Sequence, residues 1–126
     1  MSWRPERALA SWTVGLVLVQ TIILLACAET VRSPEEVEAG RQLFRQTCSR
    51  CHGENAEGML LLGKDLRGNE FVAGLTDEEL VTFLQEGRRA NHPLNERGVD
   101  MPPRGGNPGL SDDDLRQIAA YLRSLS

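Results

Sequence analysis

The sequence predicts an all-α domain of three to four helices, preceded by an apolar N-terminal segment. Three observations support this prediction. Helix-capping patterns recur along the chain, apolar residues follow each of them at helical spacing, and no stretch alternates between apolar and polar residues as a strand does. The predicted helices are separated by long loops rich in glycine and proline.

Length and charge limit the possible functions. The chain has 126 residues and a net charge of −4. Once the N-terminal segment is set aside, about 100 residues remain, which is enough for one small domain. The acidic balance argues against nucleic acid as a partner.

The first 28 residues resemble a targeting segment. An apolar stretch, residues 8–28, follows two arginines, as in an export signal. Three alternatives stay open: lipidation of Cys27 at a site that resembles a bacterial lipobox, cleavage after Ala28, or an uncleaved helix that spans the membrane. Each predicts that residues 29–126 form the domain, on the periplasmic side of a bacterial cytoplasmic membrane. Two of the three keep it anchored there, and cleavage after Ala28 would leave it soluble in the periplasm.

Three helix starts can be located from capping boxes. The box at Ser33 predicts a helix that runs to about Thr47, and the box at Thr76 predicts a short helix that stops at Gly87. The box at Ser111 predicts the last helix. Each helix has apolar residues three and four positions apart, so each is expected to bury one face.

Two long loops, residues 53–74 and 88–109, connect these helices. Loops of this length are uncommon in a compact domain unless they wrap something. The run Met59-Leu60-Leu61-Leu62 within the first loop needs an apolar surface to cover. The loops therefore predict that the domain encloses an apolar group.

The motif Cys48-Ser49-Arg50-Cys51-His52 indicates what that group is, because C-x-x-C-H is the spacing of covalent haem attachment. The two thiols can add to the two vinyl groups of haem as thioethers, and the adjacent imidazole is then held beneath the iron. A thioredoxin-like pair would need a preceding strand, and a zinc site would have only His92 as a further ligand. The motif predicts one covalently bound haem c with His52 as the proximal iron ligand.

With these residues, the chain from Ser33 to Ser126 resembles class I cytochrome c. In that family the helix that leads into C-x-x-C-H crosses a C-terminal helix, and a loop methionine supplies the sixth iron ligand. Gly40 and Phe44 match the small and aromatic positions of the first helix, and Tyr121 matches the aromatic of the last, which would lie against Gly40. The resemblance implies the class I cytochrome c fold, wrapped around a single haem.

Met101 matches the family's distal methionine. It lies 101 − 52 = 49 residues beyond His52, and two prolines stiffen the chain directly after it. His92 is the alternative sixth ligand, and a bis-histidine haem would have a lower potential. Met59 follows His52 by only seven residues, too few to reach the opposite face of the haem.

The segment Gly63-Lys64-Asp65-Leu66 departs from the family's G-P-x-L pattern, because lysine replaces proline. In the family that proline's carbonyl accepts a hydrogen bond from the proximal imidazole, and Lys64 keeps a carbonyl for this role. The haem propionates also need hydrogen-bond donors. The candidates are Arg88, Arg89, Asn91 and Arg104.

The resemblance implies an electron carrier and not an enzyme. Its partners would be redox proteins, one donor and one acceptor, in a bacterial respiratory or related electron-transport chain, with no small-molecule substrate. It could act as a carrier tethered through the N-terminal anchor or lipid, or as the monohaem subunit of a membrane oxidoreductase complex. The alternative from another class is a haem enzyme or sensor with an open sixth site, against which the position of Met101 argues.

Overall fold

Helices and irregular loops make up residues 32–126, the part of the chain that this computed structural model describes. The order of elements is α2 (Pro34–Thr47), α3 (Ser49–His52), α4 (Glu70–Gly74), α5 (Asp77–Glu86), the 3₁₀ helix η1 (Pro103–Gly106) and α6 (Asp112–Ser124). The described residues contain no strand, only two isolated antiparallel bridges. The predicted all-α class is confirmed.

The three longest helices begin at the predicted capping boxes. Ser33, Thr76 and Ser111 each accept a hydrogen bond from the backbone N–H three residues on. The carboxylate of that third residue accepts one from the cap's own backbone N–H in return. Each cap satisfies amide groups that the helix leaves without partners, which stabilises a helix by about 1 kcal/mol.

Two short α-helices, and the 3₁₀ helix η1, lie where the sequence predicts none. α3 is a single turn that contains the C-x-x-C-H motif, and α4 is five residues long within the first predicted loop. The side chain of Asn69 caps α4 by accepting hydrogen bonds from the N–H groups of Phe71 and Val72. Elements this short carry too few apolar residues for a helical period to be visible in the sequence.

α2 and α6 cross in close contact at the centre of the core. A Cβ atom on Gly40 would lie 1.8 Å from the carbonyl oxygen of Gln117, so the two backbones can meet only at a glycine. The ring of Phe44 packs against that of Tyr121, with centroids 5.3 Å apart. The sequence places Gly40 correctly in the crossing. However, the backbone of Gln117 lies closest to it, and Tyr121 packs on Phe44.

One arginine of α6 fastens the middle of the chain to the last helix. The guanidinium of Arg123 donates to the carbonyl oxygens of Val72, within α4, and of Leu75, directly after it. It also pairs with Asp77 at the start of α5, and Arg32 pairs with the same carboxylate. Burial raises the pKa of Asp77, but the hydrogen bonds from Arg32 and Arg123 lower it by a larger amount. The net pKa is therefore below the usual range.

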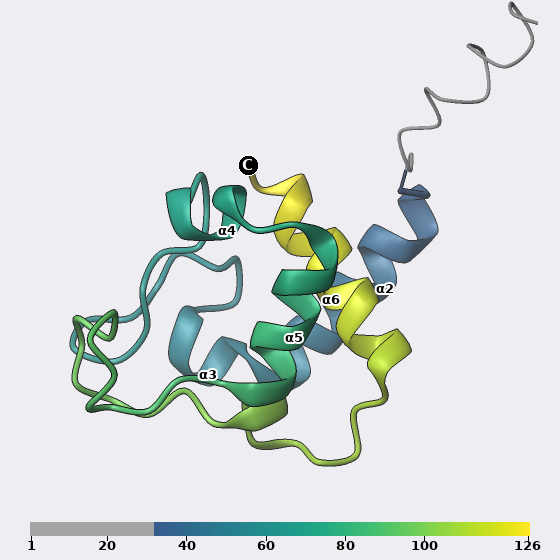
Figure 1. Ribbon diagram of the computed structural model, residues 1–126. Helices are drawn as coiled ribbons and strands as arrows, with labels where there is room; N and C mark the ends of the chain where they lie inside the picture. Colours follow the sequence, from purple (N-terminus) through teal and green to yellow (C-terminus); the bar gives the residue numbers. More distant parts are fainter. Residues whose placement is uncertain (1–31) are drawn as a thin grey trace, which may run out of the picture. The chain divides into compact units, whose positions relative to one another are not determined.

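The two long loops lie together on one side of the domain. Figure 1 shows them at the left, away from the start of α2 at the right. An ion pair between Lys64 and Glu96 connects them. Together with α2, α3, α5 and α6, these loops enclose the cavity in which the candidate site lies.

The predictions for the N-terminal segment fall outside the described residues. They concern the lipidation of Cys27, cleavage after Ala28 and the membrane anchor. Within residues 32–126, no helix combines the length and the apolar character that crossing a membrane requires.

Candidate haem site

An apolar cavity of about 410 Å³ opens between the helices and the two long loops. Its volume falls within the range of about 300–1,000 Å³ that is usual for ligand sites. Buried side chains of α2, α5 and α6 form its inner wall: Phe44, Leu80, Leu84, Ile118 and Leu122. The cavity thus replaces part of the hydrophobic core and suits a large apolar ligand.

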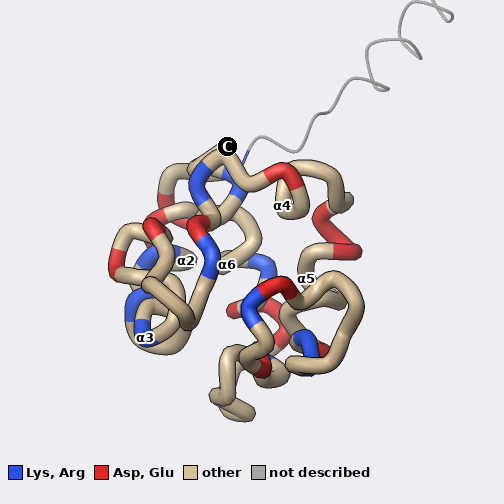
Figure 2. Tube along the Cα trace, turned by 90° about the vertical axis from the view of Figure 1, so that its left-hand side faces the viewer, with Lys and Arg blue, Asp and Glu red and all other residues tan. Residues whose placement is uncertain are grey.

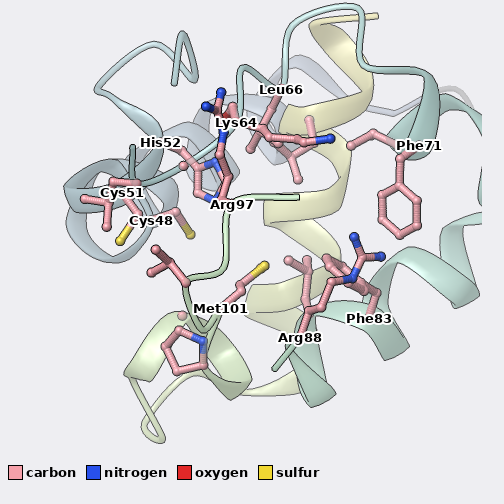
Figure 3. A pocket seen from close by; sticks show the side chains of 18 of the residues that line it. Cys48, Cys51, His52, Lys64, Leu66, Phe71, Phe83, Arg88, Arg97 and Met101 are labelled. Carbon is pink, nitrogen blue, oxygen red and sulfur yellow. The ribbon is translucent and has the colours of Figure 1, made fainter. Parts of the chain in front are cut away.

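The C-x-x-C-H motif forms one wall of this cavity. The N–H groups of Cys51 and His52 both donate to the carbonyl oxygen of Cys48, at 3.1 and 3.0 Å, so the motif is wound into one helical turn. All three side chains are half-buried and line the cavity, as Figure 3 shows. The turn therefore presents two thiols and one imidazole to the same space.

The His52 ring is oriented by a hydrogen bond from Nδ1 to the carbonyl oxygen of Lys64, at 2.9 Å. Since a carbonyl can only accept, Nδ1 carries the proton and Nε2 keeps a free electron pair for a metal. Gly63 makes this approach possible, because a Cβ there would lie 2.1 Å from the carbonyl oxygen of Cys51. The hydrogen bond predicted for Lys64 is present although proline is absent.

The Cys48 thiol is not an activated nucleophile. Burial raises its pKa to about 12, and the charge of neighbouring Cys51 adds to this effect. Redox-active C-x-x-C pairs instead have a thiol whose pKa is lowered. The two cysteines are free in the structure and do not form a disulfide. This arrangement gives no support to the thioredoxin-like alternative.

Met101 lines the cavity from the second long loop. Its backbone exchanges two hydrogen bonds with Arg88, at 2.7 and 2.8 Å, which fixes it next to the end of α5. The side chain is half-buried and packs against the core. In Figure 3 its sulfur points into the cavity, from a different side than His52.

The two alternative ligands lie outside the cavity lining. His92 is exposed, and its Nδ1 accepts a hydrogen bond from the N–H of Leu94 at 3.1 Å. Met59 is 45% exposed on the first long loop. Of the three candidates for the sixth ligand, only Met101 shares the cavity with His52.

The leucine run of the first loop does not behave as expected. Only Leu62 lines the cavity, whereas Leu60 and Leu61 are 87% and 75% exposed. They lie at the tip of a tight turn, in which the N–H of Met59 donates to the carbonyl oxygen of Gly63 and the N–H of Leu62 donates to that of Met59. Leu61 also has a positive φ of 61°, which is rare for a bulky side chain. The expectation that this run covers an apolar surface is therefore wrong for the two leucines at the tip.

Of the predicted propionate donors, Arg88 is the one in the cavity lining. Its guanidinium lies over the rings of Phe71 and Phe83, 4.4 and 4.8 Å from their centroids. Arg104 instead donates to the carbonyl oxygen of Leu110 and to Asp112. Arg104, Arg89 and Asn91 do not line the cavity.

Several polar residues in the cavity lining were not anticipated: Arg50, Asn69, Asn95 and Arg97. Asn95 anchors the second loop, because its side-chain amide donates to the carbonyl oxygens of Arg89 and Val99 at 2.9 and 2.7 Å. Arg50 lies inside the C-x-x-C-H motif and Arg97 four residues before Met101. Proximity in sequence to the C-x-x-C-H motif and to Met101 was the available signal for both arginines.

Comparison with known proteins agrees with this geometry. The family model described as cytochrome c oxidase, cbb3-type, subunit III matches residues 35–122. The chain belongs to this family. The match includes the C-x-x-C-H motif, Lys64 and Met101.

Curated relatives of this family member include large and small proteins. The cbb3-type cytochrome c oxidase subunit CcoP of Rhodobacter capsulatus is 34% identical over 88 residues, which cover 69% of this chain and 28% of the relative. Subunit FixP of Sinorhizobium medicae is 29% identical over 115 residues, or 86% of this chain and 38% of the relative. Cytochrome c-554(547) of Halothiobacillus neapolitanus is 30% identical over 97 residues, or 71% of this chain and 97% of the relative.

The chain thus spans about a third of the CcoP and FixP relatives it matches. No solved structure matches it. Membership in the cbb3-type subunit III family confirms the predicted c-type cytochrome domain, with electron transfer as its function. Haem c is the cofactor that the family implies.

The residues of the cavity fit a haem group. Its inner wall is apolar, two thiols lie within one helical turn, and a free imidazole nitrogen and a thioether sulfur are available as iron ligands. Residues 32–126 contain no group of three or more His, Cys, Asp or Glu side chains placed to hold a metal ion. A protein-ligated zinc site therefore has no support in this part of the chain.

Proposed function

We propose that this chain holds one haem c through thioether bonds from Cys48 and Cys51, with His52 and Met101 as the two axial ligands. It passes single electrons between a donor and an acceptor protein. The observation that carries the proposal is the presence of an oriented imidazole and a methionine sulfur in one apolar cavity. Bound haem supplies the one-electron exchange between ferrous and ferric iron.

The protein residues define how that exchange proceeds. The carbonyl oxygen of Lys64 holds the His52 ring in one orientation, so the ligand does not have to rotate when the charge changes. The thioether of Met101 favours the reduced state and raises the potential. Since both axial positions would be filled, no substrate binds the iron and little of the protein reorganises.

Arg88 is the best-supported donor to a haem propionate. Its guanidinium lies over the adjoining rings of Phe71 and Phe83 and donates to the carbonyl oxygen of Leu94, at 3.2 Å, so it is fixed at the cavity wall. A fixed guanidinium offers paired N–H donors to a carboxylate. Arg89 and Arg104 remain as proposals with less support, because neither lines the cavity.

The axial assignment is tested by replacing Met101 with Ala in the haem-loaded protein. The weak long-wavelength absorption band of methionine-ligated ferric haem should disappear, and the midpoint potential should fall. Met59→Ala is the matched control, since it removes an exposed methionine outside the cavity. His92→Ala should also leave the band and the potential unchanged.

If the unaltered protein lacks the band, the potential of Met101→Ala is unchanged and the spectrum of His92→Ala is changed, the sixth ligand is His92 and not Met101. Rapid binding of carbon monoxide to the unaltered reduced protein would contradict a closed sixth site. That second result would favour the haem enzyme or sensor.

The relatives favour a second form of the same function. Two of them are named as subunits of cbb3-type oxidases, so this chain can act as the monohaem subunit of a membrane oxidoreductase and not as a free carrier. In both forms, residues 1–28 export the domain to the periplasmic side. A lipid on Cys27 or an uncleaved helix would anchor it there, and cleavage after Ala28 would leave it soluble. Native purification from detergent-solubilised membranes distinguishes them, because a subunit remains with other haem proteins and a carrier is recovered alone.

A further inference from the structure

Lys64 makes two contacts in different directions. Its backbone carbonyl oxygen accepts the hydrogen bond from His52 Nδ1, at 2.9 Å. Its side-chain Nζ lies 2.7 Å from a carboxylate oxygen of Glu96, on the second long loop. Lys64 and Glu96 are both among the residues that line the cavity. One residue thus contacts the proximal histidine and, across the cavity mouth, the loop that carries Met101.

The segment that contains Glu96 is a compact turn. The side-chain oxygen of Asn95 accepts from the N–H groups of Arg97 and Gly98, at 3.1 and 3.0 Å. The side-chain amide of Asn95 donates to the carbonyl oxygen of Val99, two residues before Met101. These bonds make the turn a rigid unit, so a constraint on Glu96 also constrains the backbone that leads to Met101.

No other ion pair within residues 32–126 joins the two loops. The remaining pairs lie within a helix, within one loop, or between other elements. Figure 2 views the loop side of the domain and shows basic and acidic residues interspersed along it. The ammonium group of Lys64 therefore pairs with one specific carboxylate, that of Glu96, and not with a broad acidic surface.

We propose that Lys64 is a positioning residue for both axial ligands. Its carbonyl orients the imidazole of His52, and its ammonium group holds the Met101 loop closed through Glu96. This inference rests on the axial assignment of the proposed function. A proline at position 64 could also accept the hydrogen bond from His52, but it has no ammonium group to pair with Glu96. The ion pair between the loops therefore depends on lysine at this position.

The test measures how fast imidazole replaces the methionine sulfur in the haem-loaded ferric protein. This exchange requires the Met101 loop to open, so it reports directly on the constraint. Lys64→Met keeps the carbonyl and removes the ammonium group, and Glu96→Gln removes the carboxylate charge. Each should raise the rate by about two- to fivefold, the range expected for an exposed ion pair. The double variant should be no faster than either single variant.

Two further measurements separate positioning from a general loss of structure. The charge exchange Lys64→Glu with Glu96→Lys should return the rate to that of the unaltered protein. Added salt should raise the rate of the unaltered protein, because salt screens an exposed pair, and leave the double variant unchanged. Arg67→Gln is the matched control, since it removes an exposed ion pair with Asp65 that stays within the first loop.

Equal rates in the unaltered protein, Lys64→Met and Glu96→Gln would overturn the inference. Additive effects in the double variant, or a similar increase in Arg67→Gln, would do the same. The long-wavelength methionine band is recorded in every variant. If it is present in the unaltered protein while the rates stay equal, the inference fails and the proposed function stands. Its absence from the unaltered protein would contradict the axial assignment itself.

Discussion

Asp77 receives charged hydrogen bonds from two arginines that are far apart in the sequence. Arg32 precedes the first described helix and Arg123 lies near the end of the last. Burial alone raises the pKa of this carboxyl group, yet the two arginines lower it below its usual range. A carboxyl group whose pKa is lower in the folded than in the unfolded state stabilises the fold above its unfolded pKa, about 4. That stabilisation is lost as the pH falls through the folded pKa.

Replacing Asp77 with Asn should therefore lower the free energy of unfolding at pH 7. The expected loss is about 0.5–1 kcal/mol, because the side chain is 42% exposed and solvent screens the pairs. At a pH below the folded pKa, the variant and the unaltered protein should be equally stable. Urea unfolding at pH 7 and at low pH measures the difference.

Asp113→Asn serves as the control for this experiment, because its pair with Arg116 is largely exposed and stays within α6. Its effect should be smaller than that of Asp77→Asn at pH 7. A stability difference for Asp77→Asn that does not change with pH would show that the carboxylate charge is not what the arginines stabilise.

At the scale of elements, α2 and α6 cross so closely that no side chain fits at the crossing point. The helices meet at Gly40, where the backbone of Gln117 occupies the position that a Cβ atom would take. The aromatic pair of Phe44 and Tyr121 packs one helical turn further along each helix. Since the backbones touch, a larger residue cannot be accommodated by a change of side-chain rotamer. The helices must separate instead.

Gly40→Ala should destabilise the domain by about 3 kcal/mol, at the upper end of the usual cost of overpacking. Gly74→Ala is a matched control, because Gly74 ends α4 and nothing lies within 4 Å of its added Cβ. That control should change the stability by less than about 1 kcal/mol. Chemical denaturation of both haem-loaded variants, followed by circular dichroism, checks the contrast. Equal effects would mean that the crossing tolerates a wider separation than the structure indicates.

The sequence predicted the elements that have local signals. Three capping boxes located α2, α5 and α6, since each box depends on residues three positions apart. The turn at Met59–Gly63 was not predicted, because the exposure of Leu60 and Leu61 depends on how the loop folds back on itself. Hydrophobicity indicates that a residue can be buried and does not show that a surface is available to bury it.

At the scale of the whole molecule, the cavity takes the place that packed side chains would fill in another small domain. A cavity of about 410 Å³ is large for a fold of this size. Without a ligand the apolar inner wall of this open cavity would face water, at a cost of about 25 cal/mol for each Å² of apolar surface. Folded domains are stable by only about 5–15 kcal/mol, so this exposure would remove a substantial part of the total. The fold is therefore expected to depend on its ligand.

The variant with both Cys48 and Cys51 replaced by Ser, produced without haem, should lack a cooperative unfolding transition. It should keep helical signal in far-ultraviolet circular dichroism and bind a hydrophobic dye, as compact states without fixed packing do. The haem-loaded protein should unfold in one transition. Cys27→Ser, which changes a cysteine outside the domain, should leave that transition in place. Cooperative unfolding of the haem-free variant would contradict the dependence on ligand.

In the candidate site too, residues with a local sequence pattern could be predicted, whereas contacts between residues far apart in the chain could not. Cys48, Cys51 and His52 are recognisable because covalent attachment requires a fixed local spacing. Met101 needed the family's pattern, since nothing in its neighbourhood alone marks it as a ligand. Contacts between residues far apart in the chain, such as Lys64 with Glu96, could not be predicted. They depend on how two irregular loops meet, and neither loop has a period from which a register follows.

The shared carboxylate of Asp77 has a consequence for how such a domain can be used. Because Arg32 and Arg123 bind the same side chain, the segment before α2 and the last helix are both held to the start of α5. A domain whose first and last segments are both fastened to its interior can be joined to a new neighbour on either side without disturbing its own helices. The relatives are consistent with this modularity, since the matched region makes up 97% of one cytochrome and only 28% of an oxidase subunit. Similar domains thus occur in polypeptides of very different length.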